Sequence, residues 1–163
     1  MAITIKRDGY AQVEPNHLSA PRDGRVYGQL PAAEDIEILE QGTFVKYDYA
    51  NGEVNFTGEG PWMMVFNEEK LYDERKQMHK DYAMQAADFY DKKMYPRVFG
   101  MVTGDIFTTN AFAQDTELAI GDVVTPGEDG ILKAGEGDLE FTVVKEYTMP
   151  DGQPAVKLQC TKA

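Results

Sequence analysis

Two tight-turn signals, Asn51-Gly52 and Asp129-Gly130, constrain the fold of this chain more than any other feature. Each follows a run of alternating apolar and polar residues, and Asn-Gly or Asp-Gly in that setting favours a two-stranded hairpin. Each hairpin unit is then followed by Gly-Glu-Gly, at residues 58–60 and 135–137, and by an apolar stretch. Two copies of one unit predict a β-sandwich or a small barrel with internal pseudo-symmetry. The alternative is a chance similarity between two turn-rich segments.

The second unit lies in a glycine-rich stretch, residues 121–138, which raises the question of a phosphate-binding loop. Such a loop needs backbone amides at a helix start and usually a Gly-Lys-Ser or Gly-Lys-Thr sequence, which the chain lacks. Five acidic residues accompany one lysine, Lys133, in this stretch, and their charge repels a phosphate. They also do not follow the order of an EF-hand loop. The stretch is therefore interpreted as turns between strands.

Residues 34–163 are predicted to form one β-rich domain with an inserted α-helix at about 68–94. The β prediction depends on alternating apolar positions in residues 35–66 and on β-branched and aromatic residues from Tyr95 onward. Between them, apolar residues recur at helical spacing and predict one buried helical face, formed by Leu71, Met78, Tyr82, Ala86 and Phe89. The predicted fold class is mainly β, a β-sandwich or a small β-barrel or β-tulip-like fold, with one inserted α-helix and an extended N-terminal arm.

The arm comprises residues 1–33. Residues 7–33 contain prolines and glycines without sustained periodicity, so they bury little apolar surface by themselves. We predict an extended arm that lies on another surface, either its own body or a neighbouring subunit, with an ordinary surface loop as the alternative. Aromatic and arginine side chains are enriched at protein interfaces. The candidate partner-contact residues of the arm are therefore Tyr10, Arg22, Arg25 and Tyr27.

The charge of the chain limits its partners. Lysines and arginines number 16 and acidic residues 28, which gives a formal net charge of −12 at pH 7. Such a surface disfavours nucleic acid and anionic membranes, and it suits a partner with a basic face. No apolar run reaches the ~18 residues that span a bilayer, and the N-terminus does not resemble a secretory signal. We therefore expect a protein that is made in the cytoplasm and stays there or reaches its destination by assembly.

No set of residues in the sequence predicts catalysis, a metal site or a cofactor. His17 and His79 have no visible partners for a triad or a zinc site, and Cys160 is the only cysteine, so no internal disulfide forms. The one candidate for a hydrolase site is the polar strand end at residues 105–110. Its alternative role is hydrogen bonding in turns. We therefore predict a protein that is not an enzyme and that binds no cofactor.

Short β units and their flanking segments recur through about the last two thirds of the chain. The segments read NEEKLYDERKQMHKDYA at 67–83, YPRVFGMVTGDIFTTNAF at 95–112, GDVVTPGEDGILK at 121–133 and FTVVKEYTMPDGQPAVKLQ at 141–159. The unit of Gly-Asp-x-Val, a turn and Gly-x-Leu is similar to units in phage head accessory proteins. With the proline-rich arm, these segments resemble the decoration, or cement, proteins of tailed-bacteriophage heads.

The resemblance implies a non-enzymatic structural protein of the virion, made in the host cytoplasm and placed on the exterior of the capsid. Its implied partners are the major capsid protein and further copies of itself, often in a homotrimer, with no nucleic acid and no membrane. The family has no fixed contact motif, so no capsid-contact residue is carried over to this sequence. Two alternatives stay open: another virion component, such as a tail or baseplate piece, and a small β-barrel ligand-binding module or hydrolase.

Overall fold

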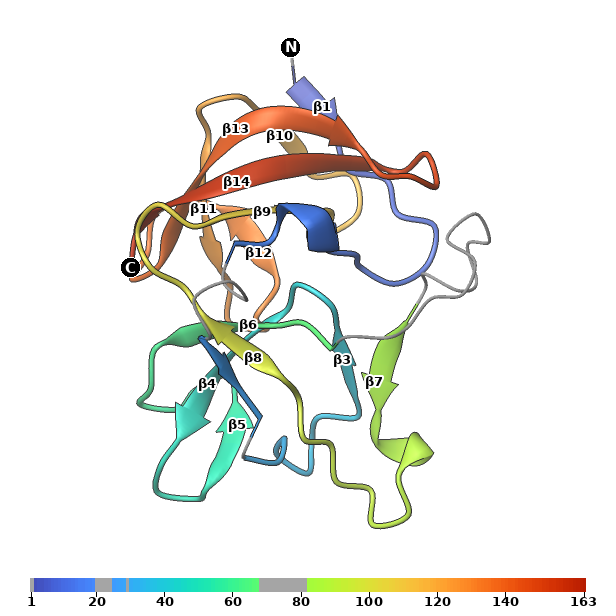
Figure 1. Cartoon of the computed structure of the whole chain (residues 1–163), viewed down its shortest axis with the longest axis vertical. Coiled ribbons are helices and arrows are strands. Elements are labelled where there is room, and N and C mark those ends of the chain that lie inside the picture. Colours follow the sequence, from blue (N-terminus) through green and yellow to red (C-terminus); the bar gives the residue numbers. More distant parts are fainter. Residues whose placement is uncertain (1, 20–24, 29, 68–81) are drawn as a thin grey trace.

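The computed structural model describes residues 2–19, 25–28, 30–67 and 82–163. The fold is mainly β, with 43% strand and 4% helical content in several antiparallel sheets, none of which is closed. Figure 1 shows two stacked halves, with β1 and β9–β14 above β2–β8. The β class expected from the hairpin signals is therefore confirmed.

The upper half is built on a five-stranded antiparallel sheet in the order β12-β11-β13-β14-β9. Its strands are β9 (Ile106–Thr109), β11 (Val123–Pro126), β12 (Leu132–Ala134), β13 (Glu140–Thr148) and β14 (Pro154–Lys162). β13 and β14 are the longest strands and form a hairpin across the turn at residues 149–153. Pro150-Asp151-Gly152 supplies the turn residues that this hairpin needs.

The lower half contains a second five-stranded antiparallel sheet in the order β2-β8-β6-β4-β5. Its strands are β2 (Val26–Tyr27), β4 (Phe44–Asp48), β5 (Glu53–Asn55), β6 (Trp62–Val65) and β8 (Val98–Gly100). The Asn51-Gly52 turn joins β4 to β5, and the Asp48 carboxylate accepts hydrogen bonds at 3.0 Å from Asn51 N, Asn51 Nδ2 and Asn55 Nδ2. These bonds, those from Asn51 first, lower the pKa of Asp48.

Two short ribbons and two 3-10 turns complete the described elements. β3 (Ile38–Glu40) pairs with β7 (Ala83–Gln85), and β1 (Ala2–Thr4) pairs with β10 (Glu117–Ala119), both antiparallel. The 3-10 turns are η1 (Pro15–His17) and η4 (Ala86–Asp88). Each ribbon leads directly into the five-stranded sheet, because β3 is followed by β4 and β10 by β11.

The two five-stranded sheets repeat one topology. The order β5-β4-β6-β8-β2 matches β12-β11-β13-β14-β9, and each sheet has one ribbon beside it. The repeat extends to single hydrogen bonds, since Gly42 N–H donates to Val65 O and Gly121 N–H donates to Val143 O, both at 2.8 Å. Both glycines occupy the positive-φ region, at +81° and +97°. The repeat in the sequence is thus matched by a repeat in the structure.

Each sheet also curves so that its two edges approach each other. A single parallel bridge joins them, Ala32↔Val54 in the lower half and Phe112↔Leu132 in the upper half. We call residues 25–100 the N-terminal unit, and residues 101–163 together with residues 2–19 the C-terminal unit. The ribbon strand has a different origin in each unit, because β7 lies between β6 and β8 along the chain whereas β1 begins the described chain.

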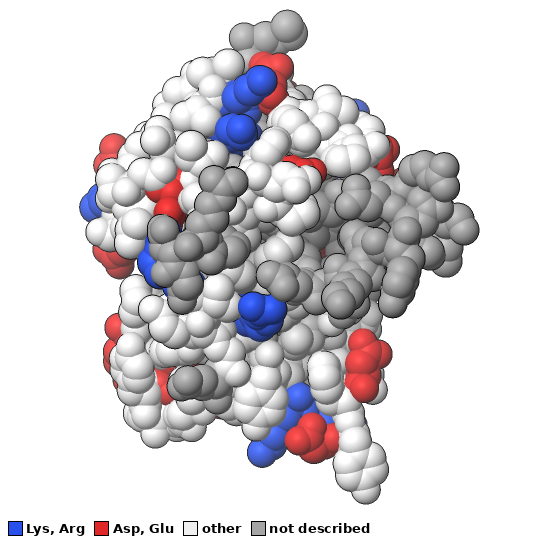
Figure 2. All heavy atoms as spheres, in the orientation of Figure 1, with Lys and Arg blue, Asp and Glu red and all other residues white. Residues whose placement is uncertain are grey.

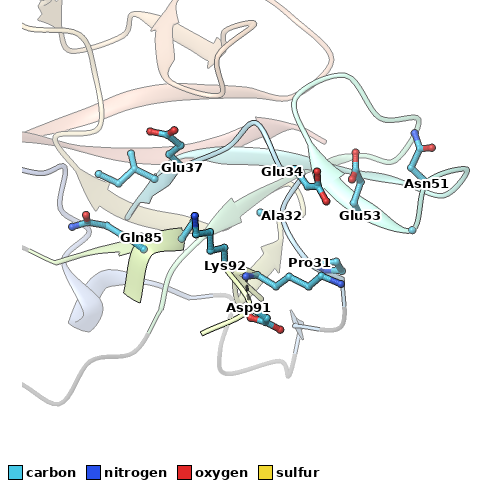
Figure 3. A pocket seen from close by; sticks show the side chains of 14 residues that line it. Pro31, Ala32, Glu34, Glu37, Asn51, Glu53, Gln85, Asp91 and Lys92 are labelled. Carbon is cyan, nitrogen blue, oxygen red and sulfur yellow. Dashed lines mark hydrogen bonds between the residues drawn. The ribbon is translucent and has the colours of Figure 1, made fainter. Parts of the chain in front are cut away.

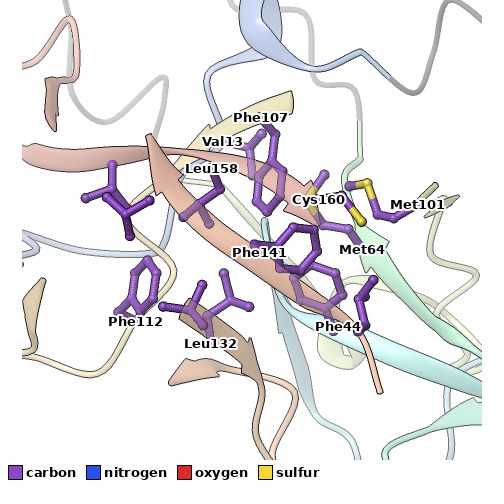
Figure 4. Packing of buried hydrophobic residues seen from close by; sticks show 14 of the residues in the cluster. Val13, Phe44, Met64, Met101, Phe107, Phe112, Leu132, Phe141, Leu158 and Cys160 are labelled. Atoms are coloured by element: carbon purple, nitrogen blue, oxygen red, sulfur yellow. The ribbon is translucent and has the colours of Figure 1, made fainter. Parts of the chain in front are cut away.

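Two hydrophobic clusters form the core, and the larger one joins the two units. The larger packs the C-terminal sheet against one face of the N-terminal sheet, with Phe44, Phe107 and Phe141 at ring-centroid distances of 5.1 to 6.3 Å (Figure 4). The second contains Val45 and lies on the opposite face of the N-terminal sheet. Because Phe44 and Val45 are neighbours in β4 and point to opposite faces, this sheet is buried on both sides.

Gly130 lies where the second hairpin turn meets the N-terminal sheet. Phe44 N–H donates to Gly130 O at 2.8 Å. Gly130 has φ +75°, and a Cβ at this position would lie 2.1 Å from Phe44 O. Its counterpart Gly52 has φ +67°, but no atom lies within 4 Å of the position its Cβ would take. The same turn thus projects freely in one unit and packs between the units in the other.

The predicted α-helix at about 68–94 is wrong over its described part, residues 82–94. These residues form β7, η4 and an irregular segment, and no α-helix occurs in the ranges that the structure describes. Ala83 and Met84 are buried, and β7 pairs with β3. Alanine, methionine and glutamine favour helices, but by less than about 1 kcal/mol per residue, so strand pairing and burial override the preference. Residues 68–81, with Leu71 and Met78, lie outside the described residues.

The described residues of the predicted arm lie on the chain's own body, one of the two surfaces considered for it. Residues 12–19 run along the outer edge of β9, where Glu14 N–H donates to Thr108 O at 2.8 Å and Ser19 N–H to Ile106 O at 3.1 Å. Apolar side chains of residues 2–19 are buried in the larger cluster: Ile5, Val13 and Leu18. The segment covers an edge strand that would otherwise leave backbone groups unpaired.

Candidate functional site

An open groove of about 990 Å³ lies on the N-terminal unit (Figure 3). Three segments form its walls: residues 31–38, which lead into β3, the 51–53 turn between β4 and β5, and residues 85–93 after β7. Its apolar lining consists of Pro31, Ala32, Ile38, Ala86 and Ala87. These segments are far apart in the sequence, so the groove exists only in the folded chain.

The path of the chain after β7 shapes the outer wall of the groove. The pairing of β7 with β3 ends where Ala86 N–H donates to Glu37 O at 2.9 Å. Residues 86–88 then bend into η4, and Lys92 adopts φ 55°, a conformation uncommon in residues other than glycine. We call residues 86–95 the aromatic segment, because it carries Phe89, Tyr90 and Tyr95.

The groove is acidic. Four carboxylates line it, Glu34, Glu37, Glu53 and Asp91, against two lysines, Lys92 and Lys93, which leaves a net charge of −2. The ion pairs Arg7–Glu40, Arg25–Asp105 and Lys162–Glu140 lie outside the groove. Glu34 and Glu37 are exposed, so their charges are available to a partner.

Exposed aromatic side chains are confined to the N-terminal unit within the described ranges. They are Tyr27, Tyr49, Phe89, Tyr90 and Tyr95, and Tyr90 is fully exposed. The large apolar side chains exposed on the C-terminal unit are aliphatic instead: Val102, Ile120 and Val144. Because aromatic residues are enriched in protein interfaces, the outer side of the N-terminal unit is the candidate contact surface.

Three tyrosines gather on the N-terminal sheet. The rings of Tyr47 and Tyr49 pack edge to face with centroids 6.2 Å apart. Burial raises the pKa of Tyr47, and the neighbouring phenols of Tyr27 and Tyr49 raise it further. Tyr27 and Tyr49 are thus further exposed aromatic side chains of the N-terminal unit that lie outside the aromatic segment.

Charged side chains do not gather into one field on the described part of the face seen in Figure 2. Lys and Arg atoms and Asp and Glu atoms are scattered over both halves, with uncharged surface between them. Charge alone therefore does not mark a contact surface on this face.

The predicted partner-contact residues have different environments. Tyr27 is 45% exposed on β2, whereas the half-buried Tyr10 accepts a hydrogen bond at 3.3 Å from Gln85 Nε2 of β7. Arg25 is held inside the molecule by Asp105, with only 18% of its side chain exposed. Arg22 lies outside the described residues. Of these four residues, Tyr27 is therefore the one for which the structure shows an exposed aromatic side chain.

The Arg25–Asp105 pair joins the two units. Arg25 donates from Nη1 and Nη2 to the two carboxylate oxygens of Asp105 at 2.5 and 2.7 Å. Ser19 Oγ and Val102 N–H also donate to this carboxylate, each at 2.9 Å. Burial acts to raise the pKa of Asp105, but the hydrogen bonds from Arg25, Val102 and Ser19 outweigh it, so the pKa is lowered.

The polar strand end at residues 105–110 fastens the N-terminal segment. Thr108 Oγ1 lies 2.8 Å from His17 Nδ1, and Thr109 Oγ1 donates to Gln12 O at 2.7 Å. Gln12 N–H donates to Asn110 Oδ1 at 2.7 Å. These side chains thus bond to residues almost a hundred positions away, and Thr109 Oγ1 also accepts a local turn hydrogen bond from Ala111 N–H at 3.0 Å, as expected for the alternative to a hydrolase site.

Cys160 lacks the environment of a nucleophile. It is buried in the larger hydrophobic cluster, and burial raises the pKa of its thiol to about 11. A thiol with such a pKa is protonated and unreactive near neutral pH. No group of three or more metal-ligating side chains is found in the parts of the chain described. His79 lies outside them.

No protein-family model matches the chain, and neither a curated protein nor a solved structure is significantly similar to it. None of the described helices is long and apolar enough to cross a membrane. The candidate site is therefore defined by the groove and the aromatic segment. Sequence reasoning assigned part of this segment to a helix face, although Phe89, Tyr90 and Tyr95 among charged residues were a signal of an exposed loop.

Proposed function

We propose that the protein is a structural virion protein that binds the exterior of a tailed-bacteriophage capsid and stabilises the shell as a decoration protein. Its partners are the major capsid protein and further copies of itself, in a homotrimer, with no nucleic acid, membrane, cofactor or catalytic step. It is made in the host cytoplasm and functions on the virion. The resemblance of residues 95–112 and 121–159 supports this proposal, and one structural observation carries it: exposed aromatic side chains concentrate on the N-terminal unit.

The fold suits an adhesive role. We assign it as two incomplete β-barrels packed on each other, because each five-stranded sheet curves until one parallel bridge joins its edges. Such a scaffold holds the groove walls and the aromatic segment at fixed positions. A few aromatic residues supply most of the binding energy in many interfaces, so a compact group of exposed aromatics is sufficient for specific attachment.

Binding to purified, expanded phage heads tests the proposal directly. The variant Phe89→Ser/Tyr90→Ser/Tyr95→Ser removes the aromatic segment's side chains, and we expect its affinity in co-sedimentation to fall at least ~10-fold, since interface aromatics each contribute about 1–2 kcal/mol or more. The matched control is Val102→Ser/Ile120→Ser/Val144→Ser, which removes three exposed apolar side chains from the C-terminal unit. It should bind within twofold of the original protein. Equal binding by both variants would contradict the assignment of the contact surface.

Two alternative functions can be distinguished from this proposal, one by the location of the protein on the virion and the other by binding of a small ligand. A tail or baseplate protein would be found away from the head when labelled particles are imaged. A ligand-binding module or hydrolase is favoured by the groove itself, whose volume suits a small molecule. That function would be supported by a melting temperature that rises with a small ligand and by absence of binding to heads.

A further inference from the structure

In the C-terminal unit, a segment of the chain itself occupies the region that corresponds to the groove. There, Ile5 N–H donates to Thr116 O at 2.8 Å, directly after β1 and directly before β10. Ala86 N–H donates to Glu37 O at 2.9 Å in the N-terminal unit, directly after β7 and directly before β3. The two units therefore share the same backbone pairing as far as this hydrogen bond.

Beyond that bond the units differ. In the C-terminal unit the chain continues beside the loop before β10, because Asp115 N–H donates to Ile5 O at 3.0 Å and Arg7 N–H to Gln114 Oε1 at 3.0 Å. Gln114 Nε2 returns a bond to Arg7 O at 2.9 Å. In the N-terminal unit the chain bends into η4, and the corresponding loop, residues 34–37, lines the open groove. The groove thus lies where the other unit holds an extended polypeptide segment.

The chemistry of that segment matches the charge of the groove. Residues 3–7 read Ile-Thr-Ile-Lys-Arg, with apolar residues alternating and two basic residues at the end. Arg7 Nη1 donates to Glu40 Oε2 at 2.6 Å, so a basic side chain of the segment already pairs with an acidic residue of β3. The groove offers Glu34, Glu37, Glu53 and Asp91 to similar groups, and Ile38 with Ala86 to apolar ones.

We infer that the groove binds an extended polypeptide segment of the capsid partner that carries lysine or arginine beside apolar residues. The identity of the partner rests on the proposed function, whereas the binding chemistry rests on the groove. A second copy of this chain is the less suitable occupant of the groove, because its own basic segment, residues 2–8, is already seated in its C-terminal unit.

A labelled free peptide with the sequence of residues 2–8, AITIKRD, is the probe for this inference. Its control peptide carries Lys6→Glu and Arg7→Glu. Fluorescence anisotropy with the full chain should show binding of the basic peptide and none of the acidic one. Amide NMR shifts should locate the basic peptide at Glu34, Ile38 and Ala86. Binding of both peptides, of neither, or shifts centred on β10 and β9 would overturn the inference.

Matched charge variants distinguish binding in the groove from general attraction of the basic peptide to an acidic protein. Glu34→Gln/Glu37→Gln/Glu53→Gln should weaken binding of the basic peptide at least fivefold. Glu117→Gln/Glu128→Gln/Glu136→Gln removes the same charge from exposed positions of the C-terminal unit. This control variant should change the affinity for the basic peptide less than twofold. Equal weakening by both variants would contradict a specific site. Self-association of the full chain that the groove variant abolishes would identify a second copy as the occupant and would also overturn the inference.

Head binding distinguishes failure of the inference from failure of the proposed function. If the original chain does not bind heads, the proposed function fails, and the peptide experiment still tests the groove by itself. If the chain binds heads and the groove variant binds them equally well, the groove inference fails, and the proposed function stands.

Discussion

The N-terminal and C-terminal units share one strand order but complete it differently. In the C-terminal unit, β1 leads into residues 5–19, which pack on the body and cover the edge of β9. In the N-terminal unit, β7 leads into the aromatic segment, which is exposed and borders an open groove. One scaffold is therefore completed in two ways, because one copy is covered by its own chain and the other leaves an open groove.

The hairpin turns show the same difference. The turn at Gly130 packs against Phe44 and fixes the two units to each other, whereas the turn at Gly52 projects from the N-terminal unit and contributes to the groove. A repeat of topology thus does not imply a repeat of role. Matched substitutions at buried and exposed counterparts should therefore differ in their effect on the free energy of unfolding.

The largest difference is expected between Gly130→Ala and Gly52→Ala. Each change places a Cβ at positive φ, which costs about 1–2 kcal/mol. At Gly130 the Cβ would also lie 2.1 Å from Phe44 O, so that strand β4 must shift. We expect Gly130→Ala to lower the free energy of unfolding by about 2–5 kcal/mol in total, because overpacking adds about 1–3 kcal/mol. Urea unfolding measures both variants, and equal losses would contradict the packing of this turn between the units.

A comparable difference is expected between Ile5→Ala and Ile38→Ala. Ile5 is fully buried after β1, whereas Ile38 is 39% exposed in the groove wall. Truncation of a buried isoleucine costs about 2–5 kcal/mol, and we expect less than about 1 kcal/mol for Ile38. The free energies of unfolding of the two variants provide the test. A small loss for Ile5→Ala would mean that the N-terminal segment does not contribute to the core.

The pH dependence of stability tests the Arg25–Asp105 pair between the units. The pKa of Asp105 is lowered from its ordinary 3.8, so its contribution is fully present above that pH and is lost as the pH falls through the lower folded pKa. Asp105→Asn should therefore flatten the decline in unfolding free energy between about pH 5 and pH 2. Asp138→Asn, which removes an exposed carboxylate, is the control. Equal slopes for Asp105→Asn and the original protein would show that the pair does not link the units.

The sequence was most informative where local chemistry decides the structure. Asn51-Gly52 and Asp129-Gly130 specify hairpins because few other dipeptides tolerate the required backbone angles, and both hairpins are present. The origin of the ribbon strands was not predictable in this way. Ala83–Gln85 has helix-favouring residues, and only its pairing with β3 makes it a strand.

The sequence also did not predict which regions are covered and which are exposed. Ile5, Val13 and Leu18 follow no regular period, so their burial depends on a pairing with residues about a hundred positions away. The groove has the same property, because its three walls meet only after the strands pair. The exposure of Phe89, Tyr90 and Tyr95 follows from the bend at η4, where the helical spacing of apolar residues predicted a continuous helix.

Electron cryo-microscopy of heads decorated with the full chain tests the central claim most directly. The claim is that the N-terminal unit faces the capsid. We predict that the reconstruction places residues 31–38, the 51–53 turn and the aromatic segment against the shell, with the β13–β14 hairpin away from it. A reconstruction in which the C-terminal unit contacts the shell and the aromatic segment faces solvent would contradict the account.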